Sequence, residues 1–468
     1  MGLLISAFAF VAALVLTWRS LSAGLGAVLT VGYFFGIVRA NFPDTYSHFI
    51  FDAAVFGFFV SFFSGPGLQP ILDPNRQVLQ RWVFLLIGWA VLMFLVPIQH
   101  PLIQLVGLRG HAFLLPFVLV GSRLRPDECN RLALWLSALN HVAFGFALAE
   151  YFVGVPAFYP ENAVTELIYR SGDVANYTAF RIPATFSNAH SYGGTMITTL
   201  PWLLGAWIQP RLADWQRLLL ASGMALAMIG VFLCAGRTPL ILLVPILLVA
   251  TFSGHLRGAA WLVWSLLIAG VAYVVSGEER MQRFMTLQDT DFVLSRIEGS
   301  VNLNFFELLL SYPFGNGIGA GGTSIPFFMQ HYLREPVTME NEYCRILLEQ
   351  GVVGLALWLA FIFWFVGRRP TDPRDSWLFG KRLLWYFSLV SFAIATTGLG
   401  LMTAIPQSML FFIGIGFVTA PPALVRRIRK PIHRTGAASS NAPNRGDERS
   451  SSASEQVCAL AQINDRNL

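Results

Sequence analysis

Apolar segments long enough to form membrane-spanning helices recur along almost the whole chain, separated by short polar stretches. A helix needs about 20 predominantly apolar residues to cross roughly 30 Å of hydrocarbon. Each segment therefore predicts one span, and about twelve or thirteen spans are expected. The segments lie near residues 2–17, 21–38, 49–64, 82–97, 103–121, 132–153, 190–208, 217–235, 238–253, 259–276, 351–367, 383–401 and 404–425.

The composition agrees with this pattern, because 55% of the residues are hydrophobic and only 12% are charged. A soluble domain carries about 25% charged residues. We therefore expect an all-α polytopic membrane protein with one large extracytoplasmic loop that contains short helices. The first apolar segment follows no basic region and has no small-residue cleavage site, so we expect an anchor rather than a signal peptide.

Basic residues are concentrated in alternate loops and in a C-terminal tail. Such loops face the cytoplasm in multi-pass proteins, which predicts a bacterial inner-membrane protein with a cytoplasmic C-terminus. The expected parts are N-terminal spans over 1–276, with a small outer loop near 154–188, a large periplasmic loop over 277–350, C-terminal spans over 351–425 and a basic, then disordered tail over 426–468. The net charge of +6 comes largely from these anchors, and no nucleic-acid partner is expected.

Arg237 lies between two apolar segments, in Cys234-Ala-Gly-Arg-Thr-Pro239. An arginine at the centre of a bilayer costs about 3 kcal/mol, so this side chain should have a partner or a wet cavity. It is either a residue that reaches the membrane interface or a ligand for an anion at the beginning of the next helix.

The small outer loop ends in Arg181-Ile-Pro-Ala-Thr-Phe-Ser-Asn-Ala-His190. Ser187 or Asn188 is expected to cap the helix that follows. Arg170 adds positive charge to the same face, and His190 is either a capping or interface residue or a catalyst. Five tyrosines are expected either in the interfacial belt or against sugar rings, namely Tyr151, Tyr159, Tyr169, Tyr177 and Tyr192.

In the large loop, apolar residues at helical spacing predict an amphipathic helix that ends before Pro313, namely Ile297, Val301, Phe305, Leu308 and Leu309. The glycine run over 315–322 is either a flexible turn or a backbone nest for a phosphate. No Lys-Ser/Thr follows it, which excludes a P-loop. Glu340 and Glu342 precede the next apolar helix, where the helix dipole alone favours acids.

Three segments of the chain, in their order and spacing, resemble the bacterial O-antigen ligase and polymerase superfamily. The run over 181–188 is similar to the family's Arg…Gly-Thr-Phe-x-Asn-Pro segment, and Gly236-Arg237-Thr238 is similar to its Ser-Arg-Gly/Thr helix break. Pro313-Phe-Gly-Asn-Gly317, followed by Glu340-Asn-x-Tyr-x-x-x-Leu-x-Glu-x-Gly351, resembles its Pro-x-x-Gly-x-Gly and His-Asn-x-Tyr/Leu-x-x-x-Leu-x-Glu-x-Gly ending. The resemblance covers roughly 180–365.

The resemblance implies a membrane glycosyltransferase that takes a glycan from a polyprenyl diphosphate carrier. Its expected partners are the lipid-linked oligosaccharide donor, a glycan acceptor, membrane lipid, and chain-length regulator or export proteins. Ligases of the family have His where this chain has Glu340, which favours a polymerase of O-antigen or exopolysaccharide repeat units. A ligase for another lipid or protein acceptor is an alternative.

The resemblance also implies roles for single residues. Arg237, Arg181 and Arg296 are expected to neutralise the leaving diphosphate, and Glu340, with Glu342 or His190 as second choice, to act as general base. The remaining expected substrate-binding residues are Arg170, Asn341, Tyr343, Gly315 and Gly317. No metal and no cofactor is expected. A lipid-linked sugar flippase or transporter is the competing class, although the sequence has no internal repeat and its candidate charges gather on one face.

Overall fold

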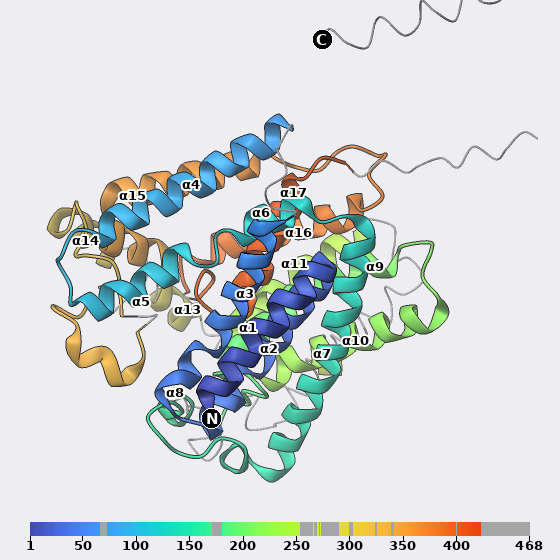
Figure 1. The fold of residues 1–468 in the computed structure, drawn as a ribbon, viewed down its shortest axis with the longest axis horizontal. Coiled ribbons are helices and arrows are strands. Elements are labelled where there is room, and N and C mark those ends of the chain that lie inside the picture. Colours follow the sequence, from blue (N-terminus) through green and yellow to red (C-terminus); the bar gives the residue numbers. More distant parts are fainter. Residues whose placement is uncertain are drawn as a thin grey trace, which may run out of the picture. The chain divides into compact units, whose positions relative to one another are not determined.

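Helices form where the apolar segments of the sequence predict them (Figure 1). The computed structural model describes residues 1–65, 73–170, 180–252, 290–298, 303–322, 325–337, 341–398 and 400–422, with a few isolated residues between 253 and 289. No strand occurs among them. The helices are α1 (Gly2–Arg19), α2 (Leu21–Asn41), α3 (Ile50–Ser64), α4 (Pro74–Phe94), α5 (Pro101–Ala112), α6 (Phe117–Arg123), α7 (Pro126–Val153), α8 (Glu166–Arg170), α9 (Ala189–Trp207), α10 (Asp214–Leu233), α11 (Arg237–Phe252), α13 (Thr290–Ile297), α14 (Leu303–Ser311), α15 (Glu342–Val366), α16 (Leu378–Ile394) and α17 (Gln407–Thr419).

Eight helical segments in the described part are long and apolar enough to cross a membrane. The protein is therefore an all-helical, multi-pass membrane protein, as the sequence predicts. Helices α11 and α17 are apolar but shorter, and α9 and α16 are not among the eight. The span expected at 259–276 and the tail at 426–468 lie almost wholly outside the described residues. The eight segments are Gly2–Arg19, Leu21–Asn41, Thr45–Ser64, Pro74–Phe94, Pro101–Arg123, Pro126–Val153, Asp214–Leu233 and Glu342–Val366.

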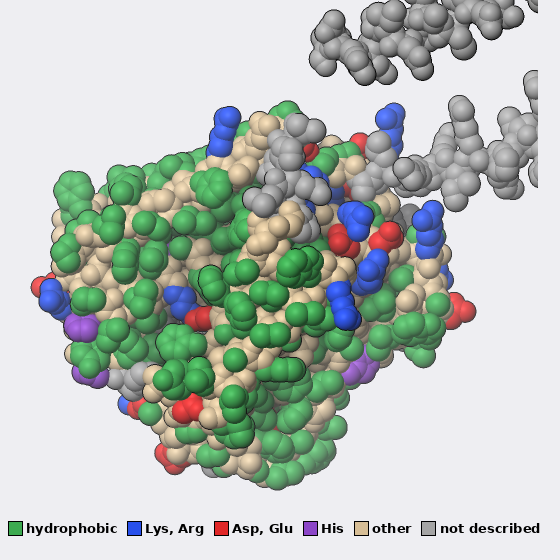
Figure 2. Space-filling model, in the orientation of Figure 1, with side chains coloured by type: hydrophobic (Ala, Val, Ile, Leu, Met, Phe, Trp, Pro, Cys, Tyr) green, Lys and Arg blue, Asp and Glu red, His purple; other side chains and the backbone are tan. Residues whose placement is uncertain are grey.

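The surface has the character that these spans require. One face of the molecule is covered mostly by hydrophobic side chains, and Lys and Arg gather on its upper right part (Figure 2). Helix α1, for example, exposes Leu4, Phe8 and Trp18, each more than two thirds exposed. Because lipid chains are as apolar as these side chains, their exposure carries no hydrophobic penalty in a bilayer.

Small residues let some of the helices approach closely. At the crossing of α6 and α17, Gly121 faces the carbonyl of Ile413 and Gly416 faces the carbonyl of Val118, with no room for a β-carbon at either glycine. Without a hydrophobic drive between helices in lipid, such close backbone contact is what holds helices together.

One expected span is broken, and the helix that contains another bends where that span was expected to begin. The apolar segment 103–121 forms α5 and α6, which are separated by a turn at 113–116. Helix α15 bends at Gly351, whose φ of 68° and ψ of −174° are non-helical. The first part of α15, before Gly351, is buried, and the second part packs beside α4 (Figure 1).

The amphipathic helix expected around 297–309 overlaps two helices of the structure, α13 and α14, and Val301 lies outside the described residues. Helix α13 ends at Ile297, and α14 carries Phe305, Leu308 and Leu309. Leu308 is buried within the protein, and α14 ends just before Pro313, as the sequence predicts.

Candidate functional site

Arg181 and His190 form a pair at the beginning of α9. Arg181 is only 7% exposed, and its Nη1 lies 3.0 Å from Nε2 of the exposed His190. Because a guanidinium only donates, Nε2 of His190 accepts this hydrogen bond and carries no proton. Asn188 caps the helix, since its side-chain oxygen accepts a hydrogen bond from the amide of Ser191 at 2.8 Å. The N-cap predicted from the sequence is therefore confirmed at Asn188.

Two buried side chains hold the backbone next to Arg181. Glu150, on α7, accepts a hydrogen bond from the amide of Ala184 at 2.9 Å. The hydroxyl of Tyr159 lies 2.7 Å from the carbonyl oxygens of both Ala184 and Phe186 and donates to them. Burial raises the pKa of Tyr159, so the hydroxyl keeps its proton. Tyr159 and Tyr192 are fully buried, and neither ring is available to a sugar or to the membrane interface, contrary to the expectation from the sequence.

Arg237 is the first residue of α11 and follows the break after α10 that the sequence predicts. The break packs on the first turn of α9, because Gly193 touches Cys234 and Pro239 so closely that a β-carbon there has no room. The structure therefore brings the segment of Arg181 and the break of Arg237 together at one helix end.

A network of buried charges lies in the first part of α15. We call Glu342, Arg345, Glu349 and His111 the α15 network. Arg345 Nη2 lies 2.6 Å from Oε1 of Glu342, and Nη1 lies 3.2 Å from Oε2 of Glu349. The three α15 residues stand three and four positions apart and so share one face of the helix. Each is at most 1% exposed.

His111, at the end of α5, completes this network. Its Nε2 lies 2.9 Å from Nη1 of Arg345 and also contacts Oε2 of Glu349, while Nδ1 lies 2.8 Å from Nε2 of Gln350. An imidazole nitrogen either donates or accepts. Because the amide nitrogen of Gln350 only donates, Nδ1 accepts and the ring proton of a neutral His111 is on Nε2. Nε2 therefore donates to Glu349 and does not accept from Arg345.

The network also joins α15 to two loops. The amide of Gly321 donates to Oε1 of Glu349 at 3.0 Å, and the amide of Gly400 donates to Oε2 of Glu342 at 3.2 Å. The amide of Glu342 donates in turn to the carbonyl of Ala395 at 3.0 Å. Both oxygens of Glu342 thus accept hydrogen bonds, and a role as general base would require the release of one of them. The loop of Gly400 leads to Gln407, which packs directly against Gly194 in α9.

The glycine run is a closely packed strap between α5 and α15. Gly317 and Gly319 lie against 98–103, Gly315 lies against the bend at Gly351, and all three glycines have positive φ. The amide of Gly315 donates to the carbonyl of Tyr312, and that of Asn316 donates to the carbonyl of Leu348. Close packing is therefore sufficient to explain these glycines, without a phosphate.

The remaining expected site residues lie in different surroundings. Asn341 caps α15 through hydrogen bonds from the amides of Tyr343 and Cys344, at 2.8 and 3.3 Å. The Tyr343 hydroxyl donates to the carbonyl of Phe392 at 2.7 Å. Arg170 pairs with Glu166, one turn earlier in the short helix α8.

The side chains of two expected site residues, Glu340 and Arg296, are not described in the structure. Glu340 lies outside the described residues, and its neighbour Asn341 is the N-cap of α15. Arg296 belongs to α13, whose backbone is described at that position while the side chain is not.

Asp52 and Arg109 are not among the site residues expected from the sequence. The two form a bidentate pair between α3 and α5, with distances of 2.6 Å from Nε to Oδ2 and 2.7 Å from Nη2 to Oδ1. Each lies inside an apolar segment. Charged residues inside membrane spans usually pair with one another. The presence of opposite charges in two different spans could therefore have predicted this pair.

Among the described residues, no group of three or more His, Cys, Asp or Glu side chains is arranged to hold a metal ion. Comparison of the chain with models of known protein families, with characterised proteins and with solved structures finds no match.

Proposed function

We propose that the protein is a glycosyltransferase of the bacterial inner membrane. In this proposal it polymerises or ligates oligosaccharide repeat units from a polyprenyl diphosphate carrier on the periplasmic face, for O-antigen or exopolysaccharide synthesis. The observation that carries the proposal is the packing at the beginning of α9. The segment with the buried Arg181 and its partner His190 leads into this helix. The helix break that precedes Arg237 packs against Gly193 of the same helix.

The proposed reaction needs positive charge where the leaving group develops negative charge. The acceptor hydroxyl oxygen bonds to the anomeric carbon, the bond from that carbon to the diphosphate oxygen breaks, and its electron pair leaves with the polyprenyl diphosphate. Preorganised arginines stabilise this charge, and the guanidinium fork suits a phosphate. Glu340 takes the hydroxyl proton in this scheme.

The experiment is complementation of a deletion strain, followed by gel analysis of its surface polysaccharide. Arg237→Ala, Arg181→Ala and Glu340→Gln are expected to abolish the polymer, with normal amounts of protein in the membrane. Arg217→Ala and Glu307→Gln change the same residue types at exposed positions elsewhere and should restore it. Polymer of normal length from Arg237→Ala or Glu340→Gln would remove that residue from the mechanism.

A lipid-linked sugar flippase or transporter is the second candidate, favoured by the α15 network. Ionisable groups buried in membrane spans are typical of transport pathways, and Glu342, Arg345, Glu349 and His111 all belong to candidate spans. The two functions differ in where lipid-linked single repeats accumulate in the deletion strain. A polymerase or ligase predicts the outer leaflet, and a flippase predicts the inner leaflet.

A further inference from the structure

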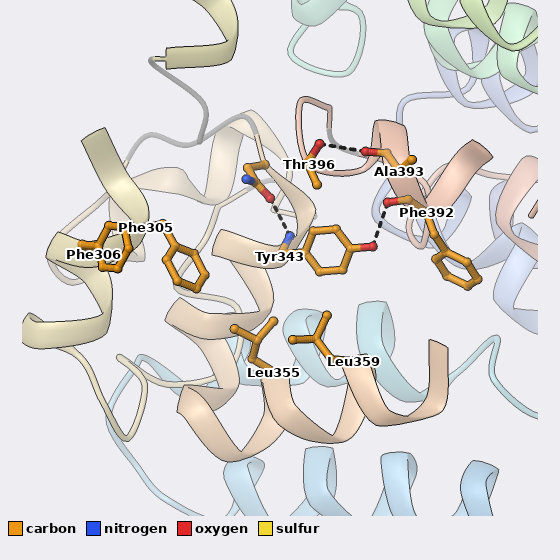
Figure 3. Close-up of a pocket in the computed structure, with 9 residues that line it drawn as sticks. Phe305, Phe306, Tyr343, Leu355, Leu359, Phe392, Ala393 and Thr396 are labelled. Carbon is orange, nitrogen blue, oxygen red and sulfur yellow. Dashed lines mark hydrogen bonds between the residues drawn. The ribbon is translucent and has the colours of Figure 1, made fainter. Parts of the chain in front are cut away.

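A cavity of about 530 Å³ lies beside the beginning of α15. Its size is in the range of small-molecule sites, roughly 300–1,000 Å³. Three helices form its walls (Figure 3): α14, α15 on both sides of its bend, and the end of α16 with the turn that follows. The lining residues are Phe305, Phe306, Asn341, Tyr343, Leu355, Leu359, Phe392, Ala393 and Thr396.

The polar groups of this wall have partners inside the protein. The Tyr343 hydroxyl donates to the carbonyl of Phe392 at 2.7 Å, and the Thr396 hydroxyl donates to the carbonyl of Ala393 at 2.7 Å. Asn341 Oδ1 accepts from the amides of Tyr343 and Cys344. A polar ligand needs convergent donors and acceptors that are not already used. The cavity therefore suits a hydrocarbon, as apolar cavities that stay free of water do.

The exposure of the lining residues shows which way the cavity opens. Leu355 and Phe392 are 5% and 4% exposed and form the floor, whereas Phe306 and Leu359 are 65% and 36% exposed and form the mouth. Around the mouth, Leu310 on α14 and Phe363 on α15 are also exposed, at 81% and 72%. Because α15 is a candidate membrane span, we expect this mouth to face the hydrocarbon of the bilayer.

We propose that this cavity binds one hydrocarbon chain of a membrane lipid, taken in sideways from the bilayer between α14 and α15. The chain lies against the rings of Phe305, Phe306 and Phe392, and its inner end reaches Leu355 at the floor. The residues that line an empty cavity lack dispersion contacts on that side. A hydrocarbon chain in the cavity supplies these contacts. An isoprenoid tail and a phospholipid acyl chain share this chemistry. The proposal does not depend on the glycosyltransferase reaction.

The test is photolabelling of the purified full-length protein in lipid nanodiscs. One arm uses a polyprenyl phosphate that carries a diazirine in its chain, and the other uses phosphatidylethanolamine with a diazirine in its acyl chain. Labelled peptides are mapped by mass spectrometry. With at least one probe, label is expected on α14 and around Leu355 and Leu359, and the probe that labels more strongly identifies the source of the chain.

Filling the floor with Leu355→Trp should lower this labelling about tenfold, the loss that corresponds to about 1.4 kcal/mol of binding. Leu4→Trp makes the same change at an exposed position of α1, which does not line the cavity, and should leave labelling unchanged. Ala393→Phe fills the cavity from an exposed lining position. If Leu355→Trp does not fold, the labelling of Ala393→Phe tests the proposal instead. Labelling spread evenly over the exposed helices, or unchanged in the folded cavity variants, would overturn the proposal.

Discussion

Arg345 and Glu342 stand one helical turn apart in α15, joined by a 2.6 Å ion pair with neither residue exposed. The same guanidinium also reaches Glu349, one turn further along. One cation therefore serves two carboxylates in a membrane-spanning helix. A buried charge without its partner is costly, so the beginning of α15 depends on this single arginine.

Arg345→Met should consequently destabilise the protein severely. It leaves Glu342 and Glu349 buried without their shared cation, at a cost of about 3–5 kcal/mol. The measurement is the apparent melting temperature of the purified protein in detergent, together with its amount in the membrane. Arg170→Met is the matched control, because Arg170 pairs with Glu166 at the surface, where such pairs contribute about 0–1 kcal/mol. Equal stability of the two variants would contradict the importance of the α15 network.

Gly351→Ala should destabilise the bend of α15. The φ of 68° and ψ of −174° belong to a region that is essentially restricted to glycine, and forcing another residue there costs on the order of 1–3 kcal/mol. A β-carbon would also meet the backbone of Pro313 and Phe314. Gly88→Ala, in α4 and with open space around it, should be neutral or stabilising by up to about 1 kcal/mol. Melting temperatures in the opposite order would show that the bend is not needed.

Gly121→Ala and Gly416→Ala should each force α6 and α17 apart, since each methyl group would enter a backbone carbonyl of the other helix. Overpacking of this kind costs about 1–3 kcal/mol. Thermal unfolding should therefore shift down for both variants, while Gly145→Ala in α7, which has open space, should leave it unchanged or raise it. A crossing that tolerates both methyl groups would require another arrangement of α6 and α17.

Asp52 and Arg109 should be energetically coupled across α3 and α5. The pair is bidentate, with side chains 18% and 33% exposed, so part of its electrostatic energy is screened. A double-mutant cycle with Asp52→Ala and Arg109→Ala should give a coupling energy of about 0.5–3 kcal/mol. The readout is again thermal unfolding. If the two single effects simply add, the contact does not contribute to stability.

The local sequence determined the helices and several of their ends. Apolar segments long enough to cross a bilayer can satisfy their backbone there only as helices, so the multi-pass class follows from the pattern alone. The N-cap at Asn188 and the break before Arg237 are local as well, because capping side chains and helix-breaking residues act within a few positions.

Only the tertiary structure decided which of these helices meet. Hydrophobicity is similar on all faces of a membrane helix, so the pattern holds little information about partners. His111 lies 234 positions from Arg345 in the chain, yet the two side chains are 2.9 Å apart. The same holds for Gly193 against Cys234 and Pro239, where close packing joins segments that the sequence leaves separate. The packing role of the glycine run, too, follows only from the tertiary structure, because the run contacts α5 and α15, which are distant from each other in the sequence.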